Sequence, residues 1–313
     1  MKKLRVVFMG TPEFAVPSLQ QIIEAGYDVP AVITVPDKPA GRGMKMQESE
    51  IKKKAIELGL KVLQPEKLRD PHFLEALKML QADLNVVVAF RMLPEIVWNM
   101  PARGTINLHA SLLPQYRGAA PINWAIINGE KETGLTTFKL KHEIDTGNIL
   151  LQKKVSIGET ENAGELYDRM KTEGAGLLVK TLDLLSENNI DEKEQLFAGN
   201  LPKPEVAILK HAPKITAETC EINWSRKATE IFNLIRGLSP YPAAFTYLNN
   251  KKLKIFEAIE IKEAPKTGEG NFSTDQKTYL YFGCGNGNIS VTDLQLEGKK
   301  RMKIADFLRG WRP

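Results

Sequence analysis

The first part of the chain alternates continuous apolar runs with segments of helical periodicity. The earliest run, Leu4–Met9, ends at Gly10, which predicts a buried strand of a parallel sheet. In the segment that follows, Val16, Leu19 and Ile22 recur at helical spacing. Further strands are predicted over residues 29–35, 61–63, 83–89 and 104–109, and further helices over residues 50–58 and 65–80.

The same alternation continues through the middle of the chain. It predicts a helix over residues 119–128, strands over 135–140 and 149–155, and a long helix over 163–186. Strands separated by helices are typical of an α/β domain, so we expect a doubly wound, mostly parallel sheet of the Rossmann-like class. The first strand ends in a lone glycine rather than GxGxxG, so no dinucleotide site is predicted there.

The pattern changes after residue 188. Residues 189–215 lose periodicity and gather prolines, which predicts a linker. A helix is then expected over residues 224–237, followed by short strands over 244–248, 252–261, 278–284 and 288–296 and by a last amphipathic helix. Short strands joined by polar turns predict a small β-barrel. We therefore expect two domains, residues 1–188 and 216–313, which the length of 313 residues also favours.

The composition bears on whether the protein is membrane-bound, secreted or metal-binding. No apolar run approaches the roughly 18 residues that a membrane helix needs, and the strand-like N-terminus is too short for a signal peptide. The only two cysteines, Cys220 and Cys284, show no metal-ligand spacing. We therefore expect a cytoplasmic protein without a bound metal.

The net charge of +5 is unevenly distributed along the chain. Residues 1–199 hold 25 Lys and Arg against 26 Asp and Glu, whereas residues 200–313 hold 18 against 12. A basic C-terminal part next to a neutral N-terminal part suits a polyanionic partner such as a nucleic acid. A basic surface that is merely solvated is the alternative.

Residues 36–47, with the sequence PDKPAGRGMKMQ, interrupt the periodicity with two prolines and two glycines. They also carry three cations, Lys38, Arg42 and Lys45. We expect a mobile basic loop rather than a regular element. The loop either is a solvated surface segment or contacts phosphates.

The strongest chemical signal lies between Ile106 and Pro121, with the sequence INLHASLLPQYRGAAP. Asn107 and His109 are two residues apart, so in a strand both side chains project from one face. A carboxamide and an imidazole at the end of a strand can stabilise an oxyanion and manage a proton. Asp145, in the sequence HEIDTG, follows at the end of a later predicted element and could orient the imidazole.

Each of these residues also has an ordinary structural interpretation. A single histidine after a strand is often a structural residue, and an aspartate before Thr-Gly is common in turns. The combination favours a site, because all three positions lie at strand ends, where ligands bind in α/β sheets. A metal centre is not expected, since no further ligands lie at suitable spacing.

Taken together, these motifs resemble the formyltransferases that use 10-formyltetrahydrofolate. INLHASLLPQYRGAAPINWAIINGE and TGLTTFKLKHEIDTGNIL carry the likeness, which begins at FMGTPEFAVPSL and covers nearly the full length. The resemblance assigns catalysis to Asn107, His109 and Asp145 and places the reduced folate at Ser111, Leu112, Leu113 and Pro114. Phe90 and Arg91 would line the same pocket, although FRMLP departs from the family's usual tyrosine and glycine there.

Within these formyltransferases the chain is most similar to the branch that acts on methionyl-initiator tRNA. The resemblance implies a catalytic domain over residues 1–188 and a tRNA-binding, OB-like barrel over residues 216–313. It also implies that Arg42, with Lys38 and Lys45, contacts the acceptor arm. Phe14 would form a wall of the methionine pocket or else pack in the core. We expect a monomer that binds initiator methionyl-tRNA and folate.

Two other classes of protein stay open. A formyltransferase that acts on a small amine, such as an amino-sugar nucleotide or glycinamide ribotide, would share Asn107, His109 and Asp145. The basic loop and the barrel argue against it, since a small substrate needs neither. A noncatalytic RNA-binding protein of the same fold is the second alternative.

Overall fold

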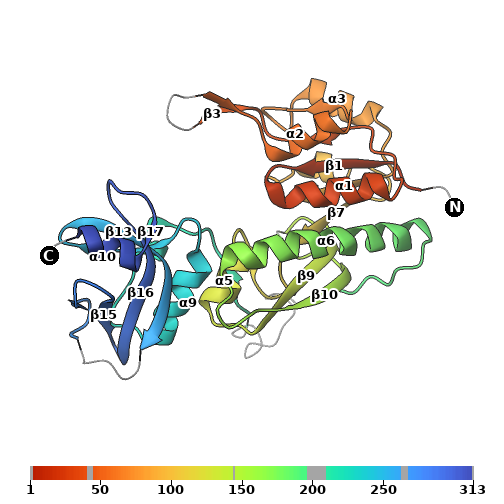
Figure 1. Ribbon diagram of the computed structural model, residues 1–313. Helices are drawn as coiled ribbons and strands as arrows, with labels where there is room; N and C mark the ends of the chain where they lie inside the picture. Colours follow the sequence, from red (N-terminus) through yellow and green to blue (C-terminus); the bar gives the residue numbers. More distant parts are fainter. Residues whose placement is uncertain (1–2, 41–44, 144, 196–208, 262–266, 312–313) are drawn as a thin grey trace. The chain divides into compact units, whose positions relative to one another are not determined.

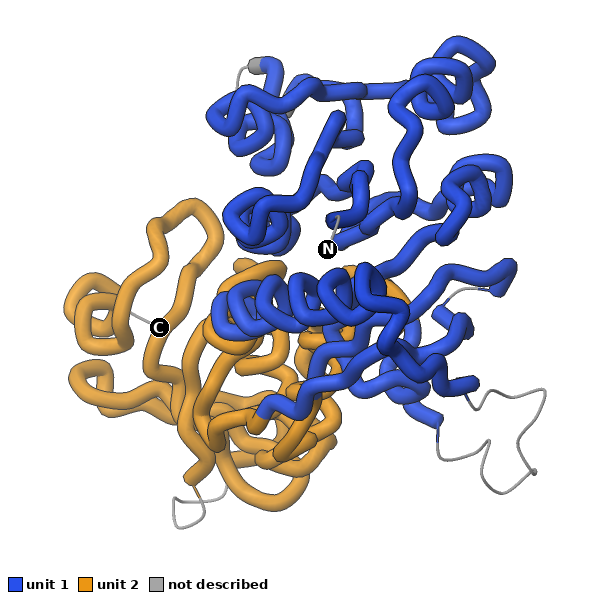
Figure 2. The backbone as a smooth tube through the Cα atoms, turned by 90° about the vertical axis from the view of Figure 1, so that its right-hand side faces the viewer, with its two compact units in different colours: residues 1–117, 134–155, 167–210 blue, residues 118–133, 156–166, 211–313 orange. Residues whose placement is uncertain are grey.

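The computed structural model describes residues 3–40, 45–143, 145–195, 209–261 and 267–311. These residues form two compact units, coloured in Figure 2. The first unit comprises residues 1–117, 134–155 and 167–210, and the second comprises residues 118–133, 156–166 and 211–313. The predicted boundaries at residues 188 and 216 stay predictions. Within the described ranges, no helix is long and apolar enough to cross a membrane.

A seven-stranded sheet forms the centre of the first unit, in the order β10-β9-β7-β6-β1-β2-β5. Five neighbouring strands are parallel, namely β1 (Val6–Gly10), β2 (Val32–Ile33), β5 (Val62–Leu63), β6 (Leu84–Val88) and β7 (Thr105–His109). Next to β7 lies the antiparallel strand β9 (Glu132–Lys139), and β10 (Ile149–Ser156) forms the edge (Figure 1). This order confirms the predicted mostly parallel, doubly wound sheet.

Apolar residues cover both faces of this sheet, as continuous apolar strands require. On one face, Val7 and Met9 of β1 pack with Phe73 and Leu77 of α3 (Pro71–Met79) and with Val97 of α4 (Glu95–Trp98). On strands β7 and β9, Leu108 and Leu135 approach α6 (Ala163–Ser186) at Gly174. A Cβ atom at Gly174 would lie 2.9 Å from Leu108 Cδ2, so the absence of a side chain allows this close packing.

Local capping explains where several helices begin. The helix predicted over residues 65–80 begins only at Pro71, because Asp70 Oδ1 accepts a hydrogen bond from Phe73 N at 3.1 Å. Ser49 caps α2 (Glu50–Glu57) in the same way. The short helix α4 was not predicted. The 3-10 turn η1 (Glu13–Ala15) leads directly into α1 (Val16–Glu24).

The segment over residues 36–47 differs from the prediction. Instead of an irregular loop, it contains β3 (Lys38–Ala40) and β4 (Lys45–Gln47), which pair as an antiparallel hairpin. Because, among the residues that the structure describes, the two strands pair only with each other, Pro39 removes no donor that a larger sheet would need. The hairpin was not predicted because prolines, glycines and cations are all depleted in strands of larger sheets.

The second unit contains an antiparallel sheet with the order β12-β13-β16-β15-β14 and a sixth strand, β17, beside β16. Its strands are β12 (Ala244–Leu248), β13 (Lys251–Ile261), β14 (Phe272–Thr274), β15 (Leu280–Cys284), β16 (Gly287–Leu296) and β17 (Met302–Lys303). The sheet order leaves β12 and β14 at opposite ends, so the described residues form a half-barrel. This confirms the expected barrel-like second domain in an open form.

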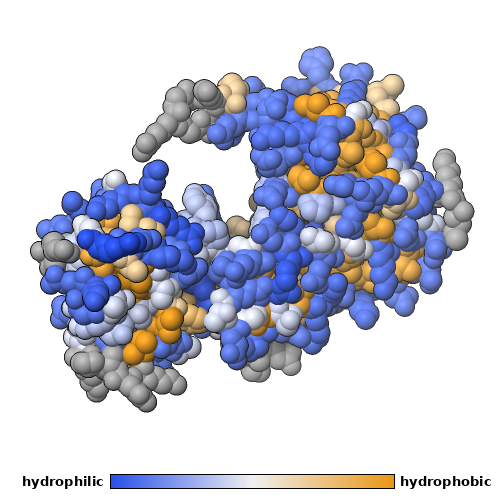
Figure 3. Space-filling model, viewed as in Figure 1, coloured by the Kyte–Doolittle hydropathy of each residue, from blue (hydrophilic) through white to orange (hydrophobic). Residues whose placement is uncertain are grey.

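Among the described residues, four helices accompany this sheet, namely α5 (Pro121–Ile127), α8 (Ala217–Cys220), α9 (Ala228–Leu238) and α10 (Ile304–Gly310). Two further short strands, β8 (Arg117–Gly118) and β11 (His211–Ala212), pair with each other. The helix predicted from residue 224 begins at Ala228, because Lys227 is its N-cap and donates its backbone N–H to Glu230 Oε2 at 3.1 Å. The Trp224 ring, before the helix, stacks on Phe282 at 4.7 Å between centroids. Ile231 and Ile235 of α9 complete the core. The visible face of this unit is mostly hydrophilic (Figure 3).

Candidate active site

Asn107 and His109 occupy alternate positions near the end of β7 and therefore share one face of the sheet. The register places Asn107 between Val87 of β6 and Phe138 of β9, and His109 beside Thr136 of β9. Both residues thus lie at the carboxyl end of the parallel strands. Ligands of open α/β sheets bind at this end.

His109 is held in one orientation by its neighbours. Its Nε2 atom lies 3.0 Å from the carbonyl oxygen of Tyr116, and its ring meets Phe138 edge-on at 6.5 Å between centroids. The side chain is only 8% exposed. Because a carbonyl oxygen can only accept, Nε2 carries a proton and donates to it, which leaves Nδ1 as the ring nitrogen that faces the site.

Asp145 approaches the other nitrogen of this ring. Its Oδ2 lies 3.9 Å from His109 Nδ1, and its side chain is 14% exposed. This separation exceeds a direct hydrogen bond but keeps the carboxylate and the imidazole in electrostatic contact. The backbone of Asp145 has a φ of 56°, in the left-handed region that aspartate tolerates better than most residues. The fold therefore brings Asp145 to the residues of β7.

Two residues that the sequence did not single out hold the loop of Asp145. Gln195 Nε2 donates to the carbonyl oxygen of Gly147 at 2.6 Å, and Arg117 Nη2 donates to Gln195 Oε1 at 2.8 Å. Burial lowers the pKa of Arg117, while the carboxylates of Asp145 and Glu143 oppose this shift. The guanidinium thus adds positive charge near Asp145. No sequence pattern singles out Gln195, which lies in the predicted linker.

The predicted folate segment, Ser111–Pro114, is a turn fixed by β9. Thr136 Oγ1 donates to the Ser111 carbonyl oxygen at 2.7 Å and accepts from Leu113 N at 3.2 Å. The Ser111 hydroxyl is itself buried and donates to the Gln115 carbonyl oxygen at 2.6 Å. Leu112 and Pro114 are half-buried, and the Leu113–Pro114 peptide is cis.

Phe90 and Arg91 lie directly after β6. Phe90 is half-buried against the apolar cluster of α3 and α4, and the Arg91 guanidinium lies 5.5 Å from its ring centroid. Arg91 Nη1 donates to the carbonyl oxygen of Glu66 at 2.8 Å, and Nη2 donates to that of Pro65. Burial lowers the pKa of this guanidinium. Arg91 therefore braces a neighbouring loop of the chain.

The remaining predicted contacts differ in accessibility. Phe14 is 5% exposed and meets Tyr167 edge-on at 5.2 Å, so little of its ring is accessible. Lys38 is exposed on β3, and Lys45 lies on β4. Arg42 lies outside the described residues. Within the ranges that the structure describes, no group of His, Cys, Asp and Glu side chains is placed to hold a metal ion.

Comparison with known proteins agrees with this geometry. A family described as formyl transferase matches residues 2–182, and a second, described as formyl transferase, C-terminal domain, matches residues 214–312. Together the two matches cover most of both units.

Full-length relatives are similar along the whole chain. The methionyl-tRNA formyltransferase of Bacteroides fragilis is 49% identical over 321 residues, which cover 99% of this chain and 97% of that protein. The enzyme of the same description from Bacteroides thetaiotaomicron is 50% identical over 322 residues, covering 100% and 98%. Among solved structures, the sugar 3N-formyl transferase WlaRD has a TM-score of 0.67 at 22% identity, with 96% of this chain and 100% of that chain covered. This last likeness concerns the fold.

Proposed function

The chain belongs to the methionyl-tRNA formyltransferase family, and we propose that Asn107, His109 and Asp145 perform its reaction. The reaction transfers the formyl group of 10-formyltetrahydrofolate to the α-amino group of methionyl-initiator tRNA. The observation that carries the assignment is the pair formed by His109 and Asp145, at 3.9 Å, next to Asn107 on the same strand face.

The chemistry requires a nucleophilic amine and a stabilised oxyanion. The amine nitrogen attacks the formyl carbon, a bond forms between them, and the bond from that carbon to the folate nitrogen breaks. Asn107 and His109 donate to the formyl oxygen as it becomes negative, and a well-placed donor contributes about 3 kcal/mol. The proton that the amine nitrogen loses after its attack passes by way of Asp145 and water to the departing folate nitrogen.

Asp145 and the backbone carbonyl of Tyr116 have different roles beside the His109 ring. The Tyr116 carbonyl lies within hydrogen-bond distance of His109 Nε2 and so fixes the ring, while Nδ1 faces Asp145 at 3.9 Å. Asp145 therefore acts mainly as a proton acceptor and a negative charge, and its part in orienting the imidazole is secondary.

The folate is proposed to bind against the turn of residues 111–114. Thr136 fixes the backbone of this turn, and Gln152 Nε2 adds a hydrogen bond to the Leu113 carbonyl oxygen at 2.9 Å. Since the Ser111 hydroxyl already donates within the turn, the half-buried Leu112 and Pro114 are the side chains left to contact the ligand. Phe90 is proposed to contribute its ring, whereas Arg91 acts through the loop that it braces.

The tRNA is proposed to contact the basic hairpin and the C-terminal residues 216–313, which belong to the basic part of the sequence. Lys38 is exposed on the hairpin, and Arg42 and Lys45 add two further cations in the sequence. Phosphate contacts of this kind give affinity that falls steeply with salt. We propose that the protein acts as a monomer, which the location of Asn107, His109 and Asp145 on a single chain allows. The buried free thiols of Cys220 and Cys284 are compatible with the cytoplasm.

A competition assay tests the choice of acceptor. The purified protein is supplied with 10-formyltetrahydrofolate and either methionyl-initiator tRNA, glycinamide ribonucleotide or an amino-sugar nucleotide, and tetrahydrofolate release is followed. The proposal predicts release with methionyl-tRNA alone. Release with a small amine but not with the tRNA would favour a small-molecule formyltransferase, and release with none would favour a noncatalytic RNA-binding protein.

A further inference from the structure

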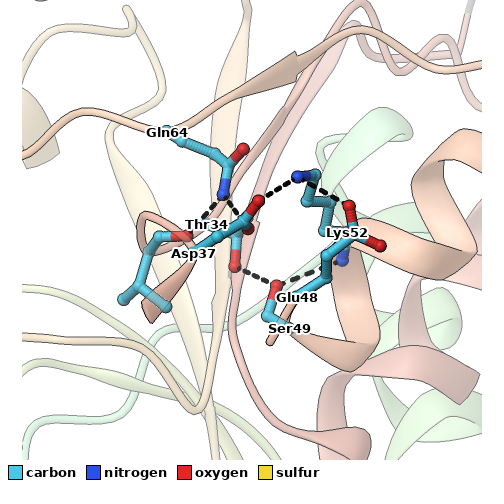
Figure 4. Close-up of polar contacts among 7 residues, drawn as sticks. Thr34, Asp37, Glu48, Ser49, Lys52 and Gln64 are labelled. Atoms are coloured by element: carbon cyan, nitrogen blue, oxygen red, sulfur yellow. Dashed lines mark hydrogen bonds and ion pairs between the residues drawn. The ribbon is translucent and has the colours of Figure 1, made fainter. Parts of the chain in front are cut away.

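A cluster of polar side chains holds the base of the β3–β4 hairpin (Figure 4). Asp37 immediately precedes β3, and Glu48 immediately follows β4. Both carboxylates contact Nζ of Lys52, with Asp37 Oδ2 at 2.5 Å and Glu48 Oε1 at 2.8 Å. One lysine of the first turn of α2 therefore joins both ends of the hairpin.

Hydrogen bonds from neighbouring elements extend this cluster. Gln64, just after β5, donates through Nε2 to Asp37 Oδ1 at 2.7 Å and to the Val35 carbonyl oxygen at 2.8 Å. Thr34 Oγ1 and Ser49 Oγ lie 2.8 Å apart. The base of the hairpin is thus tied to the end of the parallel sheet as well as to α2.

The position of Lys52 distinguishes it from its neighbour Lys53. Its side chain is 14% exposed, whereas Lys53, which pairs with Glu50 at 2.7 Å, is 53% exposed. Exposed pairs along a helix contribute little to stability. The hydrogen bond from Lys52 lowers the pKa of Asp37, and the bond to Asp37 raises the pKa of Lys52, so both groups remain charged at neutral pH.

The hairpin itself offers little other support. Its two strands pair only with each other, and Met46 is 61% exposed. An isolated two-stranded hairpin is marginally stable in water. The direction in which the strands leave the sheet must therefore be set at their base.

We propose that Asp37, Lys52 and Glu48 set the direction of the β3–β4 hairpin and thereby position its cations for the tRNA. Lys52 and Asp37 are positioning residues for the macromolecular substrate and take no part in the chemical step. This inference rests on the proposed function of the hairpin as an RNA contact.

Steady-state kinetics of Lys52→Gln test the proposal, with Lys53→Gln as the matched control on the same helix. The KM for methionyl-tRNA should rise about tenfold, in line with the loss of several phosphate contacts, while kcat and the KM for 10-formyltetrahydrofolate stay within about twofold. The control variant should match the wild type. An unchanged KM for the tRNA, or equal losses with both substrates, would overturn the positioning role.

A second readout does not depend on activity. Limited trypsin digestion, followed by mass spectrometry, reports cleavage after Arg42 and Lys45. Cleavage should be about tenfold faster in Lys52→Gln and Asp37→Asn than in Lys53→Gln, because a loosened hairpin opens more often. The double variant Asp37→Asn/Lys52→Gln should be no faster than Lys52→Gln, since the two residues act as a unit.

The two readouts separate the inference from the proposed function. Equal cleavage rates in all variants would disprove the anchoring of the hairpin, whatever the enzyme does. Faster cleavage in an enzyme whose wild type formylates no methionyl-tRNA would refute the proposed function and leave the anchor with no substrate to position.

Discussion

His109 and Asp145 face each other with 3.9 Å between Nδ1 and Oδ2, while the opposite nitrogen of the ring lies 3.0 Å from the Tyr116 carbonyl oxygen. A main-chain acceptor therefore fixes the imidazole, and no side-chain substitution removes that acceptor directly. As a result, the charge of Asp145 can be removed with the ring still in place. Because the orientation of the imidazole and the negative charge beside it come from different groups, a substitution of Asp145 tests the role of the charge alone.

Asp145→Asn should lower kcat by about 10²- to 10⁴-fold, the usual range for loss of a general base. The KM values should change little, because Asn preserves the shape of the side chain. Thermal unfolding, measured in parallel, should shift by no more than about 2 °C. A variant with wild-type turnover would remove Asp145 from the mechanism.

Asn107→Leu should lower kcat about 10²- to 10³-fold through loss of one donor to the developing oxyanion. Leucine and asparagine have approximately the same side-chain volume, so the KM values for both substrates should stay unchanged. Single-turnover rates at saturating folate and tRNA separate the chemical step from binding. A fall in affinity without a fall in the single-turnover rate would argue for a binding role instead.

Thr136→Val should raise the KM for 10-formyltetrahydrofolate, because the hydroxyl that fixes the turn of residues 111–114 is lost. The Leu113 N–H would remain buried without its partner, at a cost of about 1–3 kcal/mol in the free energy of unfolding. Thr137→Val is the matched control, since Thr137 is equally buried on β9 but bonds to Thr181. That variant should lose stability and keep its folate KM. Equal folate kinetics in both variants would contradict the placement of the ligand.

Arg42→Ala should raise the KM for methionyl-tRNA and reduce the dependence of log(kcat/KM) on log[salt] by about one unit. Removing one phosphate contact accounts for both effects. The comparison needs kcat/KM at several salt concentrations for the variant and the wild type. Identical salt slopes would mean that Arg42 meets no phosphate.

The apolar pattern was sufficient to predict the sheet that carries the site. Strand β1 is apolar on both faces, β6 is apolar except at Asn85, and β7 is apolar on one face, and this signal does not depend on their neighbours in space. The spacing of Asn107 and His109 then placed them on a common face. Asp145 was grouped with them because it also lies at the end of a predicted element, and the family resemblance assigned it to the same site; its distance from β7 in the sequence carries no spatial information.

Other parts of the site depend on contacts that no local pattern encodes. Thr136 reaches the turn of Ser111 only because β9 pairs with β7 in one register. Gln195 reaches Gly147 from a stretch without periodicity. The hairpin of β3 and β4 was missed because the ion pairs of Lys52 with Asp37 and Glu48 at its base are contacts that a local pattern does not show.

The most direct test of the whole account is the stoichiometry of formyl transfer. The purified chain is incubated with 10-formyltetrahydrofolate labelled in the formyl group and with methionyl-initiator tRNA, and labelled formylmethionyl-tRNA and tetrahydrofolate are counted. The account predicts one formylmethionyl-tRNA for each tetrahydrofolate released, with both products greatly reduced in the Asp145→Asn variant. Tetrahydrofolate release without label on the tRNA, or no release at all, would contradict it.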